Sequence, residues 1–404
     1  MLFADSSSAA KVPRHPDERA DMRLCVNKLT ALRVVRSLRS SRQHLPLTRC
    51  DLPVPNPMPR KRWSATALPT AVQALSQRAD GTARCHVAVP SASTRIQASF
   101  ASNTVYTTGL PARSFVRVWD GVCVPCPELL FIELATVMTP EVLALVGLEL
   151  CGTYSRDALD PRCGPVRYGV PPVTTVEQIR DFAQRCQGIR GLPEALDVIE
   201  LVCDNAWSPM EAIVALFAEM PVEQLGYGLG PVRLNVRHDN DARLAAMGCR
   251  TSRVPDIELP GLDIGLNYDG HEHLDLASIA DAYPDESSEA IYAVRQKYVD
   301  DIRRNRELAA SGLLVLPITA EDLFTQFGLD AAMLEAGLAA KSLFGTTVSE
   351  INLALGSLAV CQARQRLIWS LLPWTRATEY ARRRTGRRVF SLEECPAVEL
   401  PWPM

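Results

Sequence analysis

The stretch from residue 208 to residue 318 carries a fixed order of patterns that restricts the fold more than any other part of the chain. Its first helix begins at Ser208-Pro209-Met210-Glu211: Ser is a favoured N-cap, Pro fits the first helical turn, and Glu211 has the capping-box spacing from Ser208. Three strand-like runs follow, at Leu234–Arg237, Arg253–Leu259 and Ile264–Tyr268. A helical pattern over residues 287–311 then precedes a fourth strand-like run, Leu313–Ile318. The sequence therefore predicts a mixed α/β core in this region.

The composition of the remaining chain predicts three further regions. With 47% hydrophobic residues, the 404-residue chain has enough apolar material for more than one packed core. Residues 1–65 are predicted to be a basic segment that is disordered over residues 1–20 and forms a short amphipathic helix from Asp21 to Arg42, with Leu24 as one of its apolar positions. Residues 66–204 are predicted to be an α+β domain, with a helix at 66–76 and short strands at Cys85–Val89, Thr104–Thr107, Ser114–Trp119 and Val122–Val124. Residues 127–147 predict two helices divided at Thr139-Pro140, and the Gly- and Pro-rich residues 152–172 predict a loop. The α/β core then occupies residues 205–325, and residues 326–404 are predicted to be a helical, Arg-rich tail with helices at 330–344, 348–369 and 376–388.

The net charge of −3 conceals two basic segments. Residues 1–65 contain 13 Lys and Arg against 5 Asp and Glu, and residues 362–388 contain 8 Arg against one Glu. Arginine contacts to phosphate dominate nonspecific affinity for nucleic acid, so the two segments together are candidates for binding a polyanion such as DNA. The alternative is that each is a solvated helix face or a disordered arm.

The twelve cysteines predict a reduced, cytoplasmic protein. They are spread along the chain, no signal-peptide pattern precedes them, and no window approaches the roughly 18 apolar residues that a membrane span needs. We therefore expect no membrane association. Cys123-Val-Pro-Cys126 has the CxxC spacing, but no second pair follows at the distance of a structural zinc site. These two cysteines are predicted to be ordinary packing residues.

The densest polar cluster lies on the two middle strands of the predicted α/β core. Asp256 falls on the first of them, and Asn267 and Asp269 are two apart on the second, so both should point to the same side of the sheet. His271 and His273 follow at the end of that strand.

Carboxylates on adjoining strands are oxygen ligands that suit Mg²⁺, which binds one or two of them together with water and substrate phosphates. Such an ion lowers the pKa of a bound water and stabilises the charge of a phosphodiester transition state. The histidines are candidates for proton donation or phosphate contact. The alternative is structural: Asp-Gly forms a tight turn, Asp256 caps a loop, and His273 makes an internal hydrogen bond.

These motifs resemble the PD-(D/E)xK restriction-endonuclease-like superfamily, in particular its endonuclease domains related to very-short-patch-repair nucleases. Asp256 fits the family's first acidic position, and Asn267-Tyr-Asp-Gly-His-Glu-His273 fits its Glu-x-Asp-Gly-x-x-His signature apart from the first residue. Glu211 fits an acidic residue on the preceding helix. The spacing of the family's next helix is matched by Asp301, Arg304, Leu308 and Gly312.

The resemblance covers about residues 205–325 and implies a three-layer endonuclease core that binds one Mg²⁺ and DNA. It implies that Asp256, Asp269 and Glu211 hold the metal. It assigns contacts with DNA to Arg304 and His271. The implied catalytic group is Glu211, Asp256, Asn267, Asp269 and His273.

Asn267 departs from the pattern, because it stands where active members of the family carry Glu. An amide has no charge and binds a divalent cation less well than a carboxylate. Two interpretations follow. The remaining acids still bind Mg²⁺ and give a weakened or altered DNA endonuclease, which we favour, or catalysis is lost and the domain only binds nucleic acid or a protein.

A second resemblance concerns the segment from Cys85 to Tyr154. Its short strands followed by Cys126-Pro-Glu-Leu-Leu-Phe-Ile-Glu-Leu-Ala resemble AbiEi-type antitoxins and related regulators. This resemblance implies the alternative function, a non-catalytic DNA-binding regulator of toxin–antitoxin type. A capped amphipathic helix explains the same residues without that function.

Overall fold

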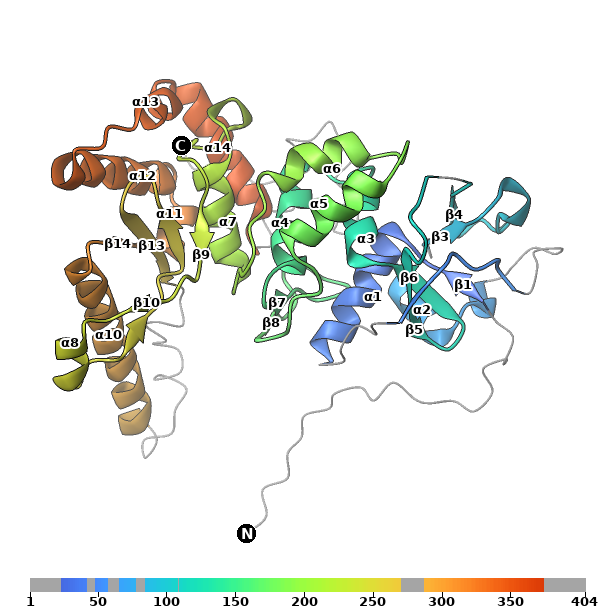
Figure 1. Ribbon diagram of the computed structural model, residues 1–404, viewed down its shortest axis with the longest axis horizontal. Coiled ribbons are helices and arrows are strands. Elements are labelled where there is room, and N and C mark those ends of the chain that lie inside the picture. Colours follow the sequence, from blue (N-terminus) through green and yellow to red (C-terminus); the bar gives the residue numbers. More distant parts are fainter. Residues whose placement is uncertain are drawn as a thin grey trace, which may run out of the picture.

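A computed structural model describes residues 23–41, 48–56, 65–77, 84–107, 109–269 and 287–373. These residues form a mixed α/β structure with several small sheets, arranged as two lobes (Figure 1). Helix α7 (Pro209–Glu219) joins the lobes, because it packs on α4 (Pro140–Leu150) of the first lobe and on strand β13 (Ile264–Asp269) of the second. Its residues 211–218 are all buried, as expected for a helix covered on several sides.

The main sheet of the first lobe draws on parts of the chain that are far apart in sequence. Its strands, in spatial order, are β1 (Leu24–Cys25), β6 (Val122–Pro125), β5 (Phe115–Trp119) and β2 (Arg49–Cys50). Strand β1 is parallel to β6, and the other neighbours are antiparallel. Two strands from the predicted N-terminal segment thus pair within this lobe, so the predicted boundary at residue 65 divides one sheet. The predicted disorder of residues 1–20 lies outside the described residues.

The other strands of the first lobe form small pairs. Strands β3 (Cys85–Val89) and β4 (Ala101–Val105) run parallel in register. The first has the predicted bounds, whereas the second begins three residues before the strand predicted at 104–107. A hairpin of β7 (Tyr154–Ser155) and β8 (Arg167–Tyr168) lies in the stretch predicted to be a loop.

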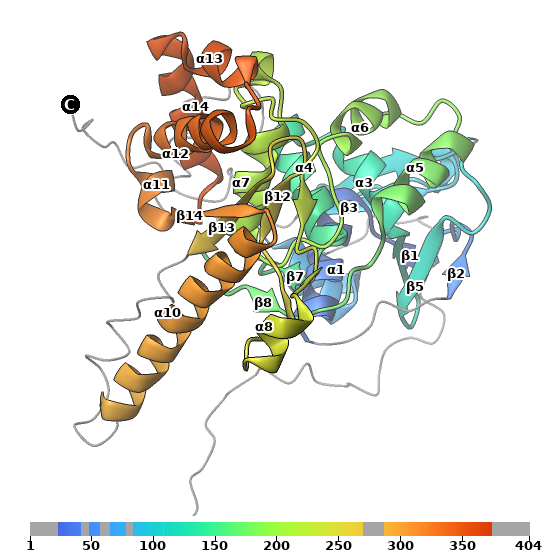
Figure 2. The ribbon, with the colours of Figure 1, turned by 60° about the vertical axis from the view of Figure 1, so that its left-hand side comes forward.

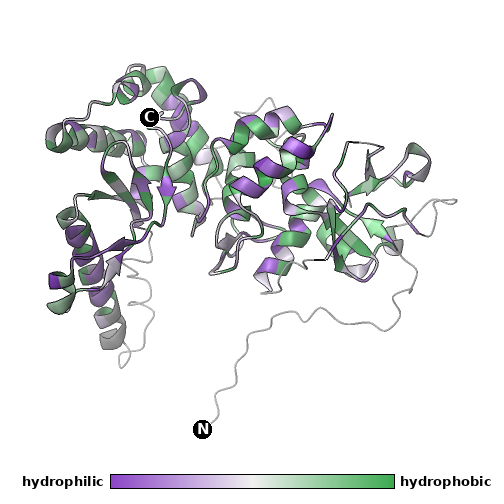
Figure 3. Ribbon diagram, in the orientation of Figure 1, coloured by the Kyte–Doolittle hydropathy of each residue, from purple (hydrophilic) through white to green (hydrophobic). Residues whose placement is uncertain are grey.

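The helices of the first lobe begin only in part where the local signals place them, because the helix predicted from Asp21 begins at Lys28, after strand β1, and the one predicted at 66–76 begins at Thr70. They are α1 (Lys28–Ser40), α2 (Thr70–Ser76), α3 (Pro127–Leu134), α4, α5 (Val176–Arg185) and α6 (Leu192–Ile199), with short 3₁₀ turns at Ala65–Ala67 and Ala92–Thr94. The predicted break within residues 127–147 is confirmed, because Thr139 is the N-cap of α4 and Pro140 its first residue. Figure 3 shows hydrophilic and hydrophobic residues alternating along α5 and α6, as in helices with one buried face.

The second lobe contains a four-stranded mixed sheet. Its spatial order is β14 (Leu314–Thr319), β13, β12 (Ile257–Leu259) and β9 (Arg233–Leu234). Strands β9, β12 and β13 are successive antiparallel neighbours, and β14 is parallel to β13. The connection between these parallel strands includes α10 (Ser287–Ala310), which packs on β14 and extends beyond the rest of the lobe (Figure 2).

The strand predicted at Arg253–Leu259 is divided in two. Its first part is β11 (Ser252–Arg253), which pairs with β10 (His238–Asp239), and α8 (Ala242–Ala246) lies between those two strands in the sequence. Its second part is β12, so Asp256 precedes a strand instead of lying within one.

Four helices complete the second lobe: α11 (Ala320–Phe324), α12 (Gly328–Ala339), α13 (Ser349–Leu355) and α14 (Leu358–Leu371). The helix predicted at 330–344 ends earlier, in a π-turn at Ala340–Phe344, and the one predicted at 348–369 breaks at Gly356. The helix predicted at 376–388 lies outside the described residues. Within the described ranges, no helix has the length and apolarity required to cross a bilayer.

Candidate functional site

Three of the predicted site residues lie at one end of the sheet in the second lobe. The antiparallel register pairs Ile257 of β12 with Leu234 of β9 and with Leu266 of β13. When this register is continued by one residue, Asn235, Asp256 and Asn267 lie side by side and form one row across the three strands. Asp269 is two residues farther along β13 at the same edge.

Asp256 is held on both sides by this row. Its carbonyl accepts the backbone N–H of Asn235 at 3.0 Å, and its own backbone N–H donates to Oδ1 of Asn267 at 2.9 Å. Its carboxylate Oδ2 accepts the backbone N–H of Tyr268 at 2.8 Å. Asp256 is half-buried, so the row fixes the orientation of a carboxylate that keeps some contact with solvent.

Asn267 is completely buried and bridges the sheet to α10. Its Oδ1 accepts from Asp256, while its Nδ2 donates to Oδ1 of Asn305 at 2.9 Å. One amide supplies both an acceptor and a donor, which an ionised carboxylate does not. The amide at position 267, where the resemblance leads one to expect Glu, therefore has a hydrogen-bonding role in this structure.

Asp269 faces the same helix as Asn267, which confirms that the two side chains share one side of the sheet. Its Oδ1 lies 3.8 Å from Nη2 of Arg304 on α10, and the same nitrogen lies 3.4 Å from Oδ1 of Asp301. The Asp269 side chain is 26% exposed and that of Arg304 18%. Arg304 thus stands at the edge of the sheet where the resemblance implies contact with DNA.

Glu211 approaches this group from α7. Ser208 caps the helix by accepting the backbone N–H of Glu211 at 3.1 Å. The Glu211 carboxylate accepts the backbone N–H of Trp207 at 3.3 Å and Nδ2 of Asn235 at 2.7 Å. The reciprocal capping contact therefore goes to Trp207, one residue before Ser208.

The electrostatics link Glu211 to Asp256. Burial, and next the negative charge of Asp256, hold the pKa of Glu211 well above its usual range. Glu211 is only 3% exposed and hydrogen-bonded to the protein, which restricts its access to a solvated ion.

The two predicted histidines and the predicted metal site remain to be located in the structure. His271 and His273 lie outside the described residues. In the part of the chain that the structure describes, no group of three or more His, Cys, Asp or Glu side chains is arranged to hold a metal ion. Asp256 and Asp269 remain as carboxylates at a common edge, and their hard oxygen atoms are the donor type that Mg²⁺ prefers.

Sequence reasoning missed the two asparagines that organise this edge. Asn235 joins Glu211 to Asp256, and Asn305 anchors Asn267 to α10. Asn305 directly follows Arg304 of the predicted helix motif, but a single Asn within a charged helix forms no recognisable sequence pattern. Asn235 follows a strand, where Asn is ordinarily attributed to a turn.

Several arginines of the two basic segments are internal. Arg36 is 6% exposed and pairs with the buried Glu149, with Nη2 to Oε2 at 2.7 Å. Arg39, 3% exposed, donates to backbone carbonyls of Glu149 and Gly152, each at 2.8 Å. Arg364 is fully buried and pairs with Asp330. The expectation of a basic surface for DNA does not hold for these three arginines.

The CxxC cysteines pack in the first lobe. Cys123 and Cys126 are both buried, as predicted, and neither is in a disulfide. Sγ of Cys123 lies 3.6 Å from Sγ of Cys50, and burial raises the pKa of Cys123 to about 12. A thiol with so high a pKa is a poor nucleophile at neutral pH.

Comparison of the chain with protein-family models, with curated proteins and with solved structures found no match.

Proposed function

We propose that the second lobe binds DNA and hydrolyses its phosphodiester bonds weakly, with one Mg²⁺ held by Asp256 and Asp269. The observation that carries this proposal is the placement of Asp256, Asp269 and Arg304 at one edge of the sheet. Two carboxylates supply enough protein ligands for Mg²⁺, which completes its coordination with water and substrate phosphate.

The order of elements supports the same proposal. Helix α7 is followed by the antiparallel strands β9, β12 and β13, then by α10 and the parallel strand β14. An endonuclease-like core of the kind proposed requires this order. We infer that α7 and α10 are the outer layers of such a core, since α7 packs on β13 and α10 on β14.

Each residue then has a definite role. A bound Mg²⁺ supplies an activated water and neutralises charge on the phosphate. Asp256 and Asp269 hold the ion, and Arg304 donates hydrogen bonds to the scissile phosphate. Glu211 is a positioning residue that acts on Asp256 through Asn235, because its carboxylate is already hydrogen-bonded inside the protein. His273 is the proposed proton donor and His271 a proposed phosphate contact, both by resemblance alone.

The test is nicking of supercoiled plasmid by the full chain with Mg²⁺ or Mn²⁺. Asp256→Asn and Asp269→Asn remove the charge and keep the size of each side chain. The matched control is Asp197→Asn, because Asp197 is exposed on α6 in the other lobe. Nicking that requires the metal, disappears in both site variants and survives in the control is expected. Nicking that persists without metal, or in Asp256→Asn, would refute the mechanism.

One observation favours a second function, binding of DNA without cleavage. Asn267 brings no charge to the edge of the sheet, and its amide is already hydrogen-bonded to Asp256 and Asn305. A regulator of toxin–antitoxin type would use the same lobe, or the first one, to bind an operator. Salt-dependent binding of one DNA sequence, with no nicking in Mn²⁺, would select this function.

A further inference from the structure

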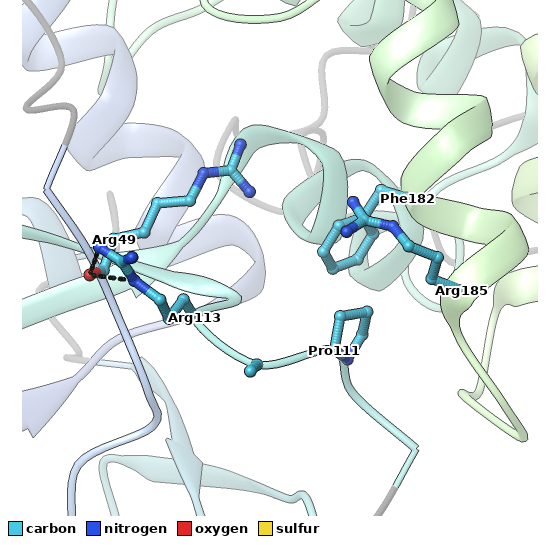
Figure 4. A pocket seen from close by; sticks show the side chains of 6 residues that line it. Arg49, Pro111, Arg113, Phe182 and Arg185 are labelled. Carbon is cyan, nitrogen blue, oxygen red and sulfur yellow. Dashed lines mark hydrogen bonds between the residues drawn. The ribbon is translucent and has the colours of Figure 1, made fainter.

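The first lobe contains a cavity of about 260 Å³ with arginines from three separate segments (Figure 4). Arg49 belongs to β2, Arg113 to the turn before β5, and Arg185 to the last turn of α5. The other lining residues are Pro111, Ala112 and Phe182. None of these six residues belongs to the candidate site of the second lobe.

The charge around this cavity is only partly compensated. Nη2 of Arg49 donates to both carboxylate oxygens of the buried Glu128, at 3.0 and 3.1 Å. Arg113 reaches the backbone carbonyl of Arg49 at 3.4 Å, and Nε of Arg185 donates to the carbonyl of Asp181 at 3.2 Å. Among the described residues, neither Arg113 nor Arg185 forms an ion pair with a carboxylate. Arg113 and Arg185 therefore keep N–H donors that are not paired with a carboxylate in the described part of the chain.

Local contacts hold these arginines in place. Asp51 accepts the backbone N–H of Arg113 at 2.6 Å and so fixes the turn that carries Arg113. The guanidinium of Arg185 lies 5.6 Å from the ring centroid of Phe182, a cation–π geometry. Figure 4 shows the Arg49 side chain extended toward the side of the cavity formed by Phe182 and Arg185. Arginines thus stand on both sides of the same space.

We propose that this cavity binds a small phosphomonoester. Guanidinium groups match the geometry of phosphate oxygens and carry permanent charge, so arginines from several directions favour a phosphate dianion. The volume is below the 300–1,000 Å³ typical of pockets for drug-sized ligands, which suits a compact ligand. Pro111 is half-buried and offers an apolar surface to the carbon part of the ester, whereas Phe182 is buried behind Arg185. This proposal does not depend on the proposed DNA cleavage.

Calorimetric titration of the full chain with phenyl phosphate, inorganic phosphate and phenol tests the proposal. The first two are expected to bind and phenol is not. Arg113→Gln and Arg185→Gln should each weaken the binding of phenyl phosphate about tenfold, since each removes charge-assisted hydrogen bonds. The matched control is Arg180→Gln on the same helix, because Arg180 pairs with the exposed Glu200 at 3.0 Å, outside the cavity lining. Far-UV circular dichroism of each variant verifies folding.

Several outcomes would overturn the proposal. If neither phenyl phosphate nor inorganic phosphate gives a heat of binding, the cavity does not bind phosphate. If Arg180→Gln weakens the binding of phenyl phosphate as much as Arg113→Gln and Arg185→Gln do, the effect comes from the overall charge of the protein. A separate titration uses a short oligonucleotide with and without a 5′-phosphate. If only the phosphorylated oligonucleotide binds, and phenyl phosphate does not, the cavity takes a nucleic-acid end and the small-ligand proposal is wrong.

Discussion

Oδ1 of Asn267 accepts the backbone N–H of Asp256 at 2.9 Å, so the residue that departs from the nuclease pattern also positions the first acid of that pattern. The same amide donates to Asn305 on α10. This relationship ties the end of β13, the start of β12 and the long helix together. It also makes Asn267 a structural residue whatever the activity of the lobe.

Replacing Asn267 by Leu should lower the free energy of unfolding by about 1–3 kcal/mol, because the backbone N–H of Asp256 and the side-chain Oδ1 of Asn305 lose their partner. Asn305→Leu removes only the second bond and should cost less. Urea denaturation at pH 7 measures both. An Asn267→Leu variant as stable as the wild type would contradict the role assigned to this amide.

Glu307 should make the protein sensitive to acid. Arg253 donates to both Glu307 oxygens, at 2.7 and 3.1 Å, and these hydrogen bonds lower the pKa of Glu307 to about 2. The pKa of an unfolded Glu is about 4.3, so this contribution to stability is complete above that pH and is lost as the pH falls toward 2. Thermal melts from pH 6 to pH 2 should decline less steeply for Arg253→Met/Glu307→Met than for the wild type. Equal slopes would contradict the expectation.

Glu219 should have the opposite pH dependence. Burial near the end of α7 raises the pKa of Glu219 to about 7, so folding disfavours its charged form. Its effect on stability is favourable below the unfolded pKa of about 4.3 and is lost as the pH rises through 7. Glu219→Gln should therefore raise the melting temperature by about 1–3 °C at pH 8 and leave it nearly unchanged at pH 4. A gain at pH 4 that equals the gain at pH 8 would exclude titration of Glu219 as the cause.

Arg36 should affect folding and leave DNA affinity unchanged. Its guanidinium pairs with the buried Glu149, so Arg36→Met leaves a carboxylate without its cation and should cost about 3–5 kcal/mol. Arg36→Met/Glu149→Met removes both charges and should recover much of that loss. Chemical denaturation gives the stabilities, and fluorescence anisotropy with labelled DNA gives the affinity of the folded double variant. Reduced affinity in that variant would restore Arg36 as a DNA contact.

Local signals in the sequence predicted much of the backbone. Ser208-Pro209 and Thr139-Pro140 place the starts of α7 and α4 correctly, because capping depends on residues within one helical turn. The strand Cys85–Val89 was predicted with its observed bounds, since an apolar run bounded by polar residues is a strong local pattern. In contrast, β1 and β2 are two residues long, too short for any periodicity, and they exist through pairing with β6 and β5.

The candidate site was predicted in part for the same reason. The spacing of Asn267 and Asp269 is enough to place them on one side of a strand. The sequence contains no signal that Asn235 and Asn305 complete this edge, because hydrogen bonds between distant segments are decided by how the segments pack. The basic helix α1 was predicted with its start seven residues too early, and the burial of Arg36 and Arg39 depends on residues more than a hundred positions away.

The starts of the capped helices α4 and α7, the strand Cys85–Val89 and the spacing of the acidic residues along the second lobe follow from short-range patterns that the amino-acid sequence determines by itself. The tertiary structure alone decided which arginines are internal, which amides bridge the strands and which three segments surround the arginine-lined cavity. The physical reason is that burial and pairing are properties of contacts between segments, and those contacts form only when the whole chain has packed.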